Sequence, residues 1–475
     1  MIKLFDTLAR KKKALKPVKA GEVTMYNCGP TVYDYVHVGN LRAFVFADLL
    51  RRYLEHQGLK VTQIMNITDV GHMLADADEG QDKIEVAASD SGKTPAEVVK
   101  FYTDAFFRDI DRLNIRRAAM YPKASEHVEQ MIKLVSRLVE KGCAYQVNVD
   151  GGTNLYFDVS SFPGYGKLSG NKIEDLNPGA RIEVRDEKKH PADFALWIYN
   201  PNHLMQWEAP WGSGYPGWHL ECSAMAMKYL GDTIDIHTGG EDNKFPHHEC
   251  EIAQSECATG KSFANNWLHV THLMVEGKKM SKSQGNYLTL DDLTAKGYEP
   301  RTVRYLLISA HYRQSLNFTF QGLDSAKSAL ARLDNFNDAL SEYSAKEGGD
   351  GKSVKAAMKG VEKALDDDLN VSEALAVAFD LVRSVNDKMA GGELGRKDKM
   401  AAEEFMKELG QMLGFTFGRT SSDEGTPKSI LELVERRDQA RAEKRFAEAD
   451  KLRDQMAEQG FVIEDTDKGT KVKRA

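Results

Sequence analysis

Two short segments of the sequence carry side chains suited to binding phosphate groups. The first is HVGN (residues 37–40), which directly precedes a stretch with helical periodicity. A helix N-terminus attracts anions through its free N–H groups and its dipole, and a glycine there lets phosphate approach the backbone. His37 and Asn40 can both donate hydrogen bonds to phosphate oxygens. Taken alone, the segment also fits an ordinary capped helix.

The second segment is KKMSKSQGN (residues 278–286), which sets Lys279 and Lys282 among serine and glycine residues. A cationic loop of this kind suits a polyphosphate whose charge must be stabilised as it leaves. A generic lysine- and serine-rich run is more often an exposed basic loop. The complete string KMSKS favours the phosphate-binding interpretation.

Cysteine, histidine and glutamate residues indicate a metal site between these two segments. The cysteines are Cys28, Cys143, Cys222, Cys250 and Cys257, too few in a chain of 475 residues for a disulfide framework. His247 and Glu251 lie four residues apart in a predicted helix and therefore share one face. All three residue types bind zinc. Spacing alone leaves the ligand set open, because His248, Glu249 and Cys250 are also available.

The bulk composition is that of an ordinary folded protein. Hydrophobic residues make up 41% of the chain and charged residues 28%, which is far from the composition of disordered proteins. No apolar run approaches the roughly 20 residues that span a bilayer, and the N-terminus lacks the apolar core of a signal peptide. We therefore expect a cytoplasmic protein without a membrane partner. Its net charge of −7 means that any contact with nucleic acid must be local.

The elements that must position these side chains alternate between strand and helix in the first part of the chain. Residues 22–28 and 59–67 read as strands, and residues 41–54 between them have helical periodicity. This βαβ pattern predicts a parallel sheet with helices on its faces. Ligands of such sheets bind at the carboxyl ends of the strands, which is where Cys28 and Thr68 fall.

Downstream, the pattern changes twice. An amphipathic helix at 126–141 and short strands and turns at 148–178 read as an insertion in the sheet domain, after which a strand at 233–237 and a helix beyond Pro246 follow. Helices without strands follow from residue 355 to 412, then a linker and a charged helical stretch at 430–459. The predicted fold is therefore α/β, a Rossmann-like parallel-sheet domain with an inserted connective segment, followed by a C-terminal all-α region.

HVGN followed far downstream by KMSKS resembles the HIGH and KMSKS signature pair of class I aminoacyl-tRNA synthetases. The first motif departs from HIGH at Val38 and at Asn40, which replaces a histidine but can still donate a hydrogen bond. The segments GPTVYDYVHVGN (29–40), PGWHLECSAM (216–225) and DIHTGGEDNKFPHHECEIAQS (235–255) resemble those of cysteinyl-tRNA synthetases. Further similar segments at 304–318, 364–375 and 440–456 extend the resemblance over nearly the whole chain.

The resemblance implies a cysteine–tRNA ligase, an ATP-dependent enzyme of protein biosynthesis that we expect to be a monomer. The cysteine carboxylate would attack the α-phosphate of ATP, with Mg²⁺ as the counter-ion of ATP, and the cysteinyl group would then pass to tRNA(Cys). The implied divisions are 1–125 and 206–265 (the two halves of the catalytic domain), 126–205 (the insertion), 266–335 (the KMSKS loop and stem-contact region), 336–417 (a helical bundle), 418–428 (a linker) and 429–475 (an anticodon-binding module).

In that family a zinc ion (Zn²⁺) is held by positions that match Cys28, Cys222, His247 and Glu251. Cys143, Cys250 and Cys257 are then expected to be packing residues, the usual role of a free cysteine. Cysteine and serine differ only by sulfur for oxygen, which a hydrophobic pocket separates poorly, whereas zinc binds a thiolate well and an alcohol badly. Glu251 is the ligand expected to loosen when the substrate thiolate arrives.

The resemblance also implies the remaining site residues. Gly29, Thr68, Trp218 and His237 surround the bound cysteine. ATP is bound by His37, Asn40, Gly240, Asp242, Lys279 and Lys282, of which the histidine, the asparagine and the two lysines are the catalytic residues. Arg441, Phe446 and Asp450 match positions that contact the anticodon, and arginine and an aromatic ring suit unpaired bases. Val472 stands where the family often has tryptophan.

Two rival functions fit parts of the same pattern. A ligase that joins cysteine to an amino sugar, as in mycothiol biosynthesis, shares the catalytic domain, the zinc site and both loops but lacks the C-terminal module. A zinc-containing RNA-binding protein without catalysis leaves HVGN and KMSKS, in that order, unexplained. Cysteine-dependent exchange of pyrophosphate into ATP, followed by charging of tRNA, separates the three.

Overall fold

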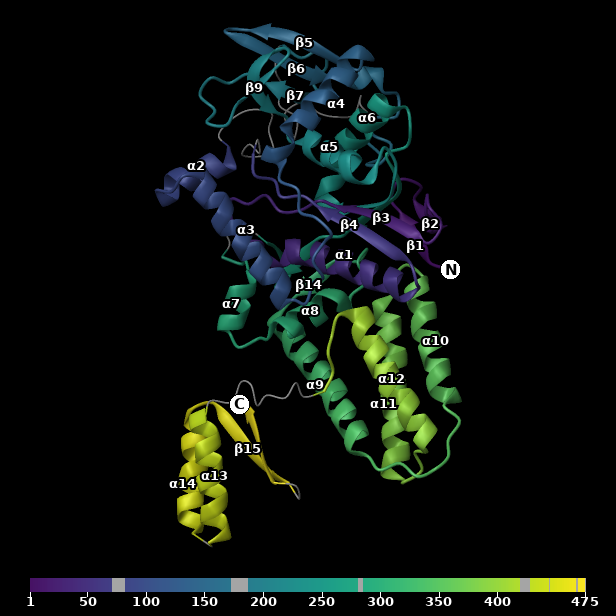
Figure 1. Cartoon of the computed structure of the whole chain (residues 1–475), viewed down its shortest axis with the longest axis vertical. Coiled ribbons are helices and arrows are strands. Elements are labelled where there is room, and N and C mark those ends of the chain that lie inside the picture. Colours follow the sequence, from purple (N-terminus) through teal and green to yellow (C-terminus); the bar gives the residue numbers. More distant parts are fainter. Residues whose placement is uncertain are drawn as a thin grey trace. The chain divides into compact units, whose positions relative to one another are not determined.

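The computed structural model describes residues 1–70, 82–171, 187–280, 285–418, 428–443, 445–466 and 469–474 (Figure 1). The chain divides into two compact units, Met1–Thr416 and Phe417–Ala475. Among the described residues, no helix is both long enough and apolar enough to span a bilayer. Each unit is described in turn below.

A four-stranded parallel sheet forms the centre of the first unit. Its order is β11-β10-β3-β4, made of β3 (Glu22–Asn27), β4 (Lys60–Met65), β10 (Ile234–Gly240) and β11 (Ala264–Val270). The side chains of β10 are buried along almost its whole length, as expected for an inner strand covered on both faces. α1 (Val38–His56) connects β3 to β4, so the predicted βαβ unit and the α/β fold are confirmed.

α1 is buried around most of its circumference because other helices cover the side that faces away from the sheet. It contacts β4, β10 and β11 on one side and α8 (Pro300–Ser309) and α12 (Arg396–Leu413) on the other. A buried ion network links these helices: Asp48 Oδ2 accepts from Arg52 Nε at 2.7 Å and from Arg304 Nη2 at 2.5 Å. Breaking such a network would leave an unpaired buried charge, so it fixes the packing of α1.

The segment after β4 adds two helices and then the insertion. The two helices are α2 (Lys83–Ser91) and α3 (Pro95–Arg112). The insertion begins with the short 3-10 helix η2 (Ala124–His127) and α4 (Val128–Glu140), which has a strongly apolar face. A five-stranded antiparallel sheet follows, in the order β5-β6-β7-β9-β8, with β5 (Ala144–Val149), β6 (Gly152–Phe157), η3 (Val159–Ser161), β7 (Phe194–Ile198), β8 (Trp207–Ala209) and β9 (Gly212–Pro216). This sheet therefore continues as far as Pro216.

Two helices lead the chain back to the parallel sheet. α5 (His219–Leu230) precedes β10, and the 3-10 helix η5 (Glu241–Lys244) and α6 (His247–Thr259) follow it. Both long helices pack on α4 and share one hydrophobic core with the inserted sheet. The core thus holds the insertion firmly against α5 and α6, which carry Cys222, His247 and Glu251.

The expectation that Cys143 and Cys257 are packing residues is wrong. They form a disulfide that joins the connection between α4 and β5 to the last turn of α6, with a Cα–Cα separation of 6.7 Å. Their separation of 114 positions in the sequence gave no sign that α4 and α6 lie side by side. Cys250 is a buried member of the shared core, as expected.

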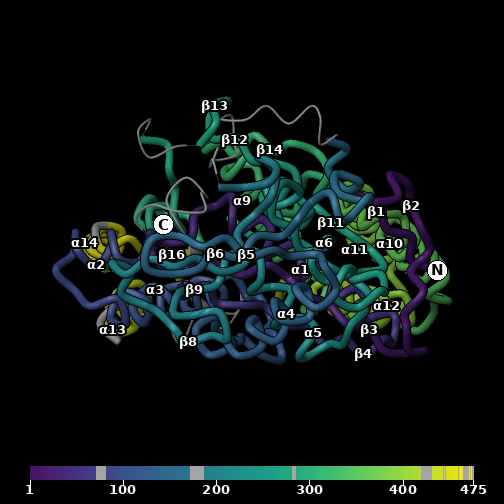
Figure 2. The backbone as a smooth tube through the Cα atoms, turned by 90° about the horizontal axis from the view of Figure 1, so that it is seen from above, coloured from purple at the N-terminus to yellow at the C-terminus, as the bar shows by residue number. Residues whose placement is uncertain are grey.

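A small three-stranded sheet carries Lys279, the first residue of KMSKS, and is called the KMSKS sheet below. Its order is β13-β12-β14, with β12 (Leu273–Val275), β13 (Lys278–Lys279) and β14 (Leu316–Phe318), and its strands lie together in Figure 2. The helices α7 (Leu290–Ala295) and α8 lie between β13 and β14 in the chain. β1 (Lys3–Asp6) and β2 (Lys11–Ala14) form a hairpin whose first strand contacts β11.

Long helices complete the first unit, and the second unit mixes helix and strand. α9 (Phe320–Glu342), α10 (Lys352–Asp366), α11 (Val371–Ala390) and α12 pack together, which confirms the predicted helical region. The second unit contains α13 (Lys428–Ala442), α14 (Phe446–Glu458) and an antiparallel hairpin of β15 (Phe461–Thr466) and β16 (Gly469–Arg474). Ile430, Val434, Met456 and Phe461 form its core. The hairpin departs from the predicted all-α character of this part of the chain.

Candidate active site and metal centre

A cleft of about 760 Å³ opens at the carboxyl ends of β3 and β10, where a parallel sheet is expected to bind its ligand. It brings together residues that follow β3, β4 and β10, residues of α1 and α5, and residues of the KMSKS sheet. The predicted site residues that line it are Cys28, Gly29, His37, Asn40, Thr68, Trp218, Cys222, Gly240, Asp242, His247 and Lys279. Lys282 lies outside the described residues.

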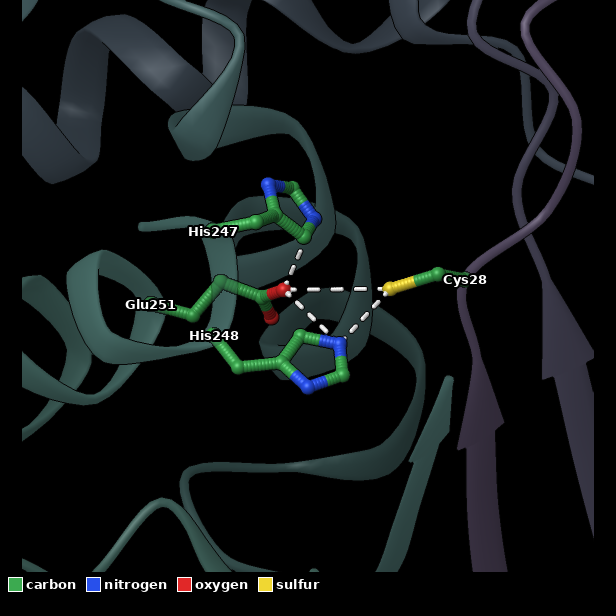
Figure 3. A group of neighbouring side chains, drawn as sticks. All are labelled: Cys28, His247, His248 and Glu251. Carbon is green, nitrogen blue, oxygen red and sulfur yellow. Dashed lines mark hydrogen bonds and ion pairs between the residues drawn. The ribbon is translucent and has the colours of Figure 1, made fainter. Parts of the chain in front are cut away.

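Cys28, His247, His248 and Glu251 lie close together (Figure 3), and Cys28 and His247 also line the cleft. One ligand atom from each lies within 4.8 Å of the others. Cys28 stands directly after β3, whereas the other three lie in the first turns of α6. Glu251 Oε1 is 3.0 Å from His247 Nε2, and Cys28 Sγ is 3.1 Å from His248 Nε2. The predicted pair His247 and Glu251 therefore does share a helix face that points at Cys28.

Cys222, from α5, lies at the edge of this group. Its Sγ is 3.9 Å from Cys28 Sγ and 3.7 Å from Asn66 Oδ1. The geometry thus brings five potential donors together, two thiols, two imidazoles and one carboxylate, where a closed zinc site uses four. His248 is a donor that the resemblance left out, although spacing alone had kept it open.

The electrostatics of the group fit a bound cation. Burial raises the pKa values of the Cys28 and Cys222 thiols, so that both are neutral without a positive partner. Burial also opposes the charge of Glu251, but His237 and His247 outweigh it and hold its pKa at about 2. A divalent metal would stabilise two thiolates in such a buried site and release their protons. The donor set fits zinc in both ligand type and burial.

A second layer of side chains orients the donors. His219 Nδ1 is 3.0 Å from His247 Nδ1, and His269 Nε2 is 2.8 Å from His248 Nδ1. Contacts to the second ring nitrogen fix the orientation of a metal-binding imidazole. Sequence reasoning missed His219 and His269; the position of His269 at the end of β11, beside the other strand ends, was the available signal.

The residues expected to surround cysteine fall into two groups. Gly29, Thr68 and Trp218 line the cleft next to the metal donors, and the Trp218 ring stacks on His247 with a centroid distance of 4.4 Å. At Gly29 a Cβ atom would lie 1.7 Å from the backbone oxygen of Asn66, so no side chain fits there. His237 is fully buried, and its Nε2 lies 2.8 Å from Glu251 Oε2. It therefore contacts a donor instead of lining the cleft.

The HVGN turn forms the N-terminal cap of α1. His37 Nδ1 accepts hydrogen bonds from the N–H groups of Gly39 and Asn40, each at 3.1 Å, and Asn40 Oδ1 accepts from the His37 N–H at 3.2 Å. Because Nδ1 is an acceptor, the neutral His37 ring carries its proton on Nε2. The reciprocal bonds form a capping box in which a histidine takes the usual place of serine or threonine.

The remaining predicted residues line other parts of the cleft or belong to the second unit. Gly240 ends β10, and Asp242 in η5 has its Oδ1 3.4 Å from His272 Nε2. Lys279 is exposed on β13. In the second unit, Arg441 is exposed in the last turn of α13. Phe446 begins α14 and has 60% of its surface exposed, and Asp450 pairs with Arg453.

Comparison with known proteins identifies the fold of the first unit. Residues 14–328 match the model of the tRNA synthetases class I (C) catalytic domain. Among solved structures, Mycobacterium tuberculosis methionyl-tRNA synthetase with methionyl-adenylate is similar, with a TM-score of 0.59 at 15% identity over 82% of this chain and 88% of that chain. A ternary complex of Agrobacterium radiobacter K84 agnB2 LeuRS gives a TM-score of 0.58 at 12% identity, over 84% and 85%. The first unit thus has the class I synthetase fold.

More specific matches cover the rest of the chain. Residues 360–418 match the DALR domain, and residues 423–472 match the cysteinyl-tRNA ligase anticodon binding domain. Cysteine--tRNA ligases of Caldicellulosiruptor saccharolyticus and Protochlamydia amoebophila are 43% and 44% identical over 100% of this chain and 100% and 98% of their own length. That of Thermus thermophilus is 42% identical over 98% of both. The chain belongs to the cysteine--tRNA ligase family.

Proposed function

We propose that this chain activates L-cysteine with ATP and transfers the cysteinyl group to the 3′ end of tRNA(Cys). The single observation that carries the proposal is the shared cleft. The thiols of Cys28 and Cys222 line it together with the HVGN turn and Lys279. The proposed sites for a thiol amino acid and for phosphate would thus share one cavity. The match of residues 423–472 to an anticodon binding domain supports tRNA as the acceptor.

We propose that Cys28, Cys222, His247 and Glu251 hold one zinc ion. When bound, zinc would select the substrate by favouring its thiolate over the hydroxyl of serine, so that no editing domain is needed. Asn66 supports this arrangement, since its Oδ1 accepts from the Gly29 N–H at 2.8 Å and lies 3.7 Å from Cys222 Sγ. Trp218, stacked on His247, would close the side of the cysteine pocket.

In the first step, a carboxylate oxygen of cysteine attacks the α-phosphorus of ATP, and the bond to the bridging oxygen of the β-phosphate breaks. The products are cysteinyl-adenylate and pyrophosphate. His37 Nε2–H, Asn40 and the N-terminus of α1 would bind the triphosphate. Lys279 and Lys282 would stabilise the charge on the departing pyrophosphate. Gly240 and Asp242 would contact the ribose, and Mg²⁺ would accompany ATP.

In the second step, a hydroxyl of the terminal ribose of tRNA attacks the carbonyl carbon of the adenylate and displaces AMP. We propose that Arg441, Phe446 and Asp450 contact the anticodon, because α13 and α14 expose them on one compact unit. Stacking on an exposed aromatic ring suits unpaired bases. The enzyme would act as a monomer in the cytoplasm, where ATP and tRNA are found, since all the donors come from one chain.

Pyrophosphate exchange into ATP tests the first step, and charging of tRNA(Cys) tests the second. We expect exchange that depends on cysteine and not on serine, together with charging of the 3′ end. An absence of exchange would contradict the proposal. Exchange without charging would instead favour the ligase that joins cysteine to an amino sugar, which the second unit argues against.

A further inference from the structure

A cluster of aromatic rings lies at the rim of the cleft and has no role in the function proposed above. Tyr35, from the loop before α1, meets Phe101 and Tyr102 of α3, with ring centroids 5.9 Å and 5.2 Å away, and these two rings are 5.1 Å apart. All three contacts are edge to face, the favoured geometry for aromatic pairs. Tyr35 also lines the cleft, so the ring cluster of Tyr35, Phe101 and Tyr102 is continuous with the active site.

The ring cluster is exposed and carries positive charge beside it. Phe101 has 43% of its surface exposed, although a large apolar side chain gains free energy by burial. The ammonium group of Lys93 lies 4.4 Å from the centroid of the Phe101 ring. Lys83 lies 5.6 Å from the Tyr33 ring, and both of these residues line the cleft. Aromatic rings with cations beside them form a surface suited to single-stranded nucleic acid.

The backbone around the ring cluster is held in place from several sides. The Tyr287 hydroxyl donates to the backbone oxygen of Tyr35 at 2.9 Å, and the Tyr287 ring meets His37 edge to face. The start of α3 is fixed by a capping box in which Thr94 and Glu97 bond reciprocally. The ring cluster is therefore a fixed platform, and its Tyr35 stands two residues before the HVGN turn.

The positive charge beside the ring cluster is partly offset by acids. Burial and then the charge of Asp34 raise the pKa of Tyr102, so an acid lies near the same rings. On α3, Lys100 pairs with Asp104 at 2.5 Å. The favourable free energy of binding nucleic acid here would therefore come mainly from stacking of bases on the rings.

We propose that Phe101, together with Tyr35, Tyr102 and Lys93, binds the unpaired 3′-terminal nucleotides of tRNA. This inference rests on the proposed function, which requires the terminal ribose to enter the cleft for the second step. The nucleotides before it must cross the rim, and the ring cluster offers them a stacking surface there. The ligand is thus an unpaired RNA end, recognised by its bases and by the phosphate beside Lys93.

The test compares Phe101→Leu, which keeps apolar bulk without a ring, with Phe101→Trp, which keeps a ring. We expect Phe101→Leu to raise KM for tRNA roughly tenfold in the charging reaction, the loss of one stacked base, while cysteine-dependent exchange stays unchanged. Phe101→Trp should restore charging, and Lys93→Met should raise KM in the same direction. Met120→Ala is a matched control, because Met120 is also 43% exposed but lies outside the ring cluster.

A tRNA that lacks its last three unpaired nucleotides identifies the part of the RNA that is bound. If the ring holds the 3′ end, wild type and Phe101→Leu should bind this shortened tRNA with equal affinity. Unchanged charging by Phe101→Leu, an equal loss for full-length and shortened tRNA, or a loss of exchange in both Phe101 variants would overturn the inference. Failure of the proposed function is distinguishable, since wild type itself would then show no exchange.

Discussion

Cys28 Sγ lies 3.1 Å from His248 Nε2 and 3.9 Å from Cys222 Sγ, so two side chains compete for the fourth position beside Cys28, His247 and Glu251. The second nitrogen of His248 is 2.8 Å from His269, which holds its ring toward Cys28. Cys222 instead offers a second sulfur, the softer donor and the better match for zinc. Substituting His248 and Cys222 one at a time distinguishes which of them is the fourth ligand.

We predict that Cys222→Ser lowers zinc content and cysteine-dependent exchange together, whereas His248→Gln retains zinc. The reason is that serine cannot replace a thiolate ligand at neutral pH, while His248 orients Cys28 from outside the ligand set. Metal analysis of the purified variants measures the zinc content. Cys250→Ala serves as the control, since Cys250 is a buried cysteine of α6 that belongs to the core. Full zinc and normal exchange in Cys222→Ser would refute this ligand set.

At the scale of single residues, the sequence predicted those site residues that short spacing or the family resemblance connects. His247 and Glu251 share a helix face because they lie four positions apart, and that relation holds in the structure. The contacts of His219 and His269 with the donors depend on how α5, α6 and β11 pack, which no local pattern encodes. The burial of His237 behind Glu251 has the same origin.

At the scale of elements, Arg42 joins α1 to the KMSKS sheet. Its guanidinium donates to the backbone oxygens of Thr271, His272, His311 and Gln314 at 2.8 to 3.3 Å. Burial lowers the pKa of Arg42 to about 10, which leaves it charged at neutral pH. The side chain thus ties α1, which begins at the HVGN turn, to the segments that lead into β12 and β14 of the KMSKS sheet.

We predict that Arg42→Met lowers the free energy of unfolding by about 2 to 4 kcal/mol, because several carbonyl groups would lose a charged donor while remaining buried. Exchange should fall as well, since Thr271 and His272 line the cleft. Thermal unfolding and the exchange assay measure the two effects. Arg383→Met is the control, because the Arg383 side chain on α11 is 71% exposed. Equal melting temperatures for the two variants would contradict the role assigned to Arg42.

On α3, the buried carboxyl group of Asp109 lowers the stability of the fold when it is ionised. Its side chain is 1% exposed. Burial, and then the charge of Asp291, raises its pKa to about 6. Because the folded state holds this proton more tightly than the unfolded state, stability is greatest below pH 4 for this group and is lost as pH rises to about 6. Asp109→Asn should therefore gain stability relative to wild type between pH 4 and 7, on the order of 3 kcal/mol.

Melting temperatures of wild type and Asp109→Asn across that pH range measure the difference. The exposed Asp104 of the same helix, changed to asparagine, controls for the loss of one negative charge. A difference that does not grow with pH would show that Asp109 is ionised as easily in the folded state as in the unfolded one.

The order of elements was predictable wherever periodicity was strong. The βαβ unit, α4 and the helices from α9 to α12 follow from regular apolar spacing, and the structure has them. The charged stretch 430–459 instead forms two helices that break before Phe446, and the β15–β16 hairpin follows it. This hairpin gains its stability from packing Phe461 on Ile430 and Met456, a long-range contact that local propensity does not report.

At the scale of the whole molecule, the Cys143–Cys257 disulfide closes a loop that contains the entire inserted sheet, β10 and most of α6. Its ends are 114 residues apart, and chain-entropy arguments give about 4 to 5 kcal/mol for a loop of this size. The proposed cytoplasmic location is reducing, where such bonds are uncommon. We therefore expect the oxidised and reduced enzymes to differ in stability more than in activity.

We predict that Cys257→Ser melts several degrees below wild type when both are purified without reductant. Added dithiothreitol should bring wild type down to the same temperature, because the variant has no bond to lose. Zinc content and exchange should be unchanged, since neither cysteine touches the metal donors. A thiol titration of the denatured protein gives the number of oxidised cysteines, and a variant that melts with wild type in the absence of reductant would contradict the prediction.

The strand order β11-β10-β3-β4 has a consequence for synthesis on the ribosome. β3 and β4 leave the exit tunnel early and can pair at once, but the other edge of β3 must wait for β10. At a ribosomal rate of about 5 to 20 residues per second, roughly 10 to 40 seconds separate the two strands. During that interval β3 presents an apolar, unpaired edge to the cell, which is the feature that invites aggregation or chaperone binding. Cys28, at the end of that strand, likewise meets its partners on α6 only after more than half of the polypeptide has been made.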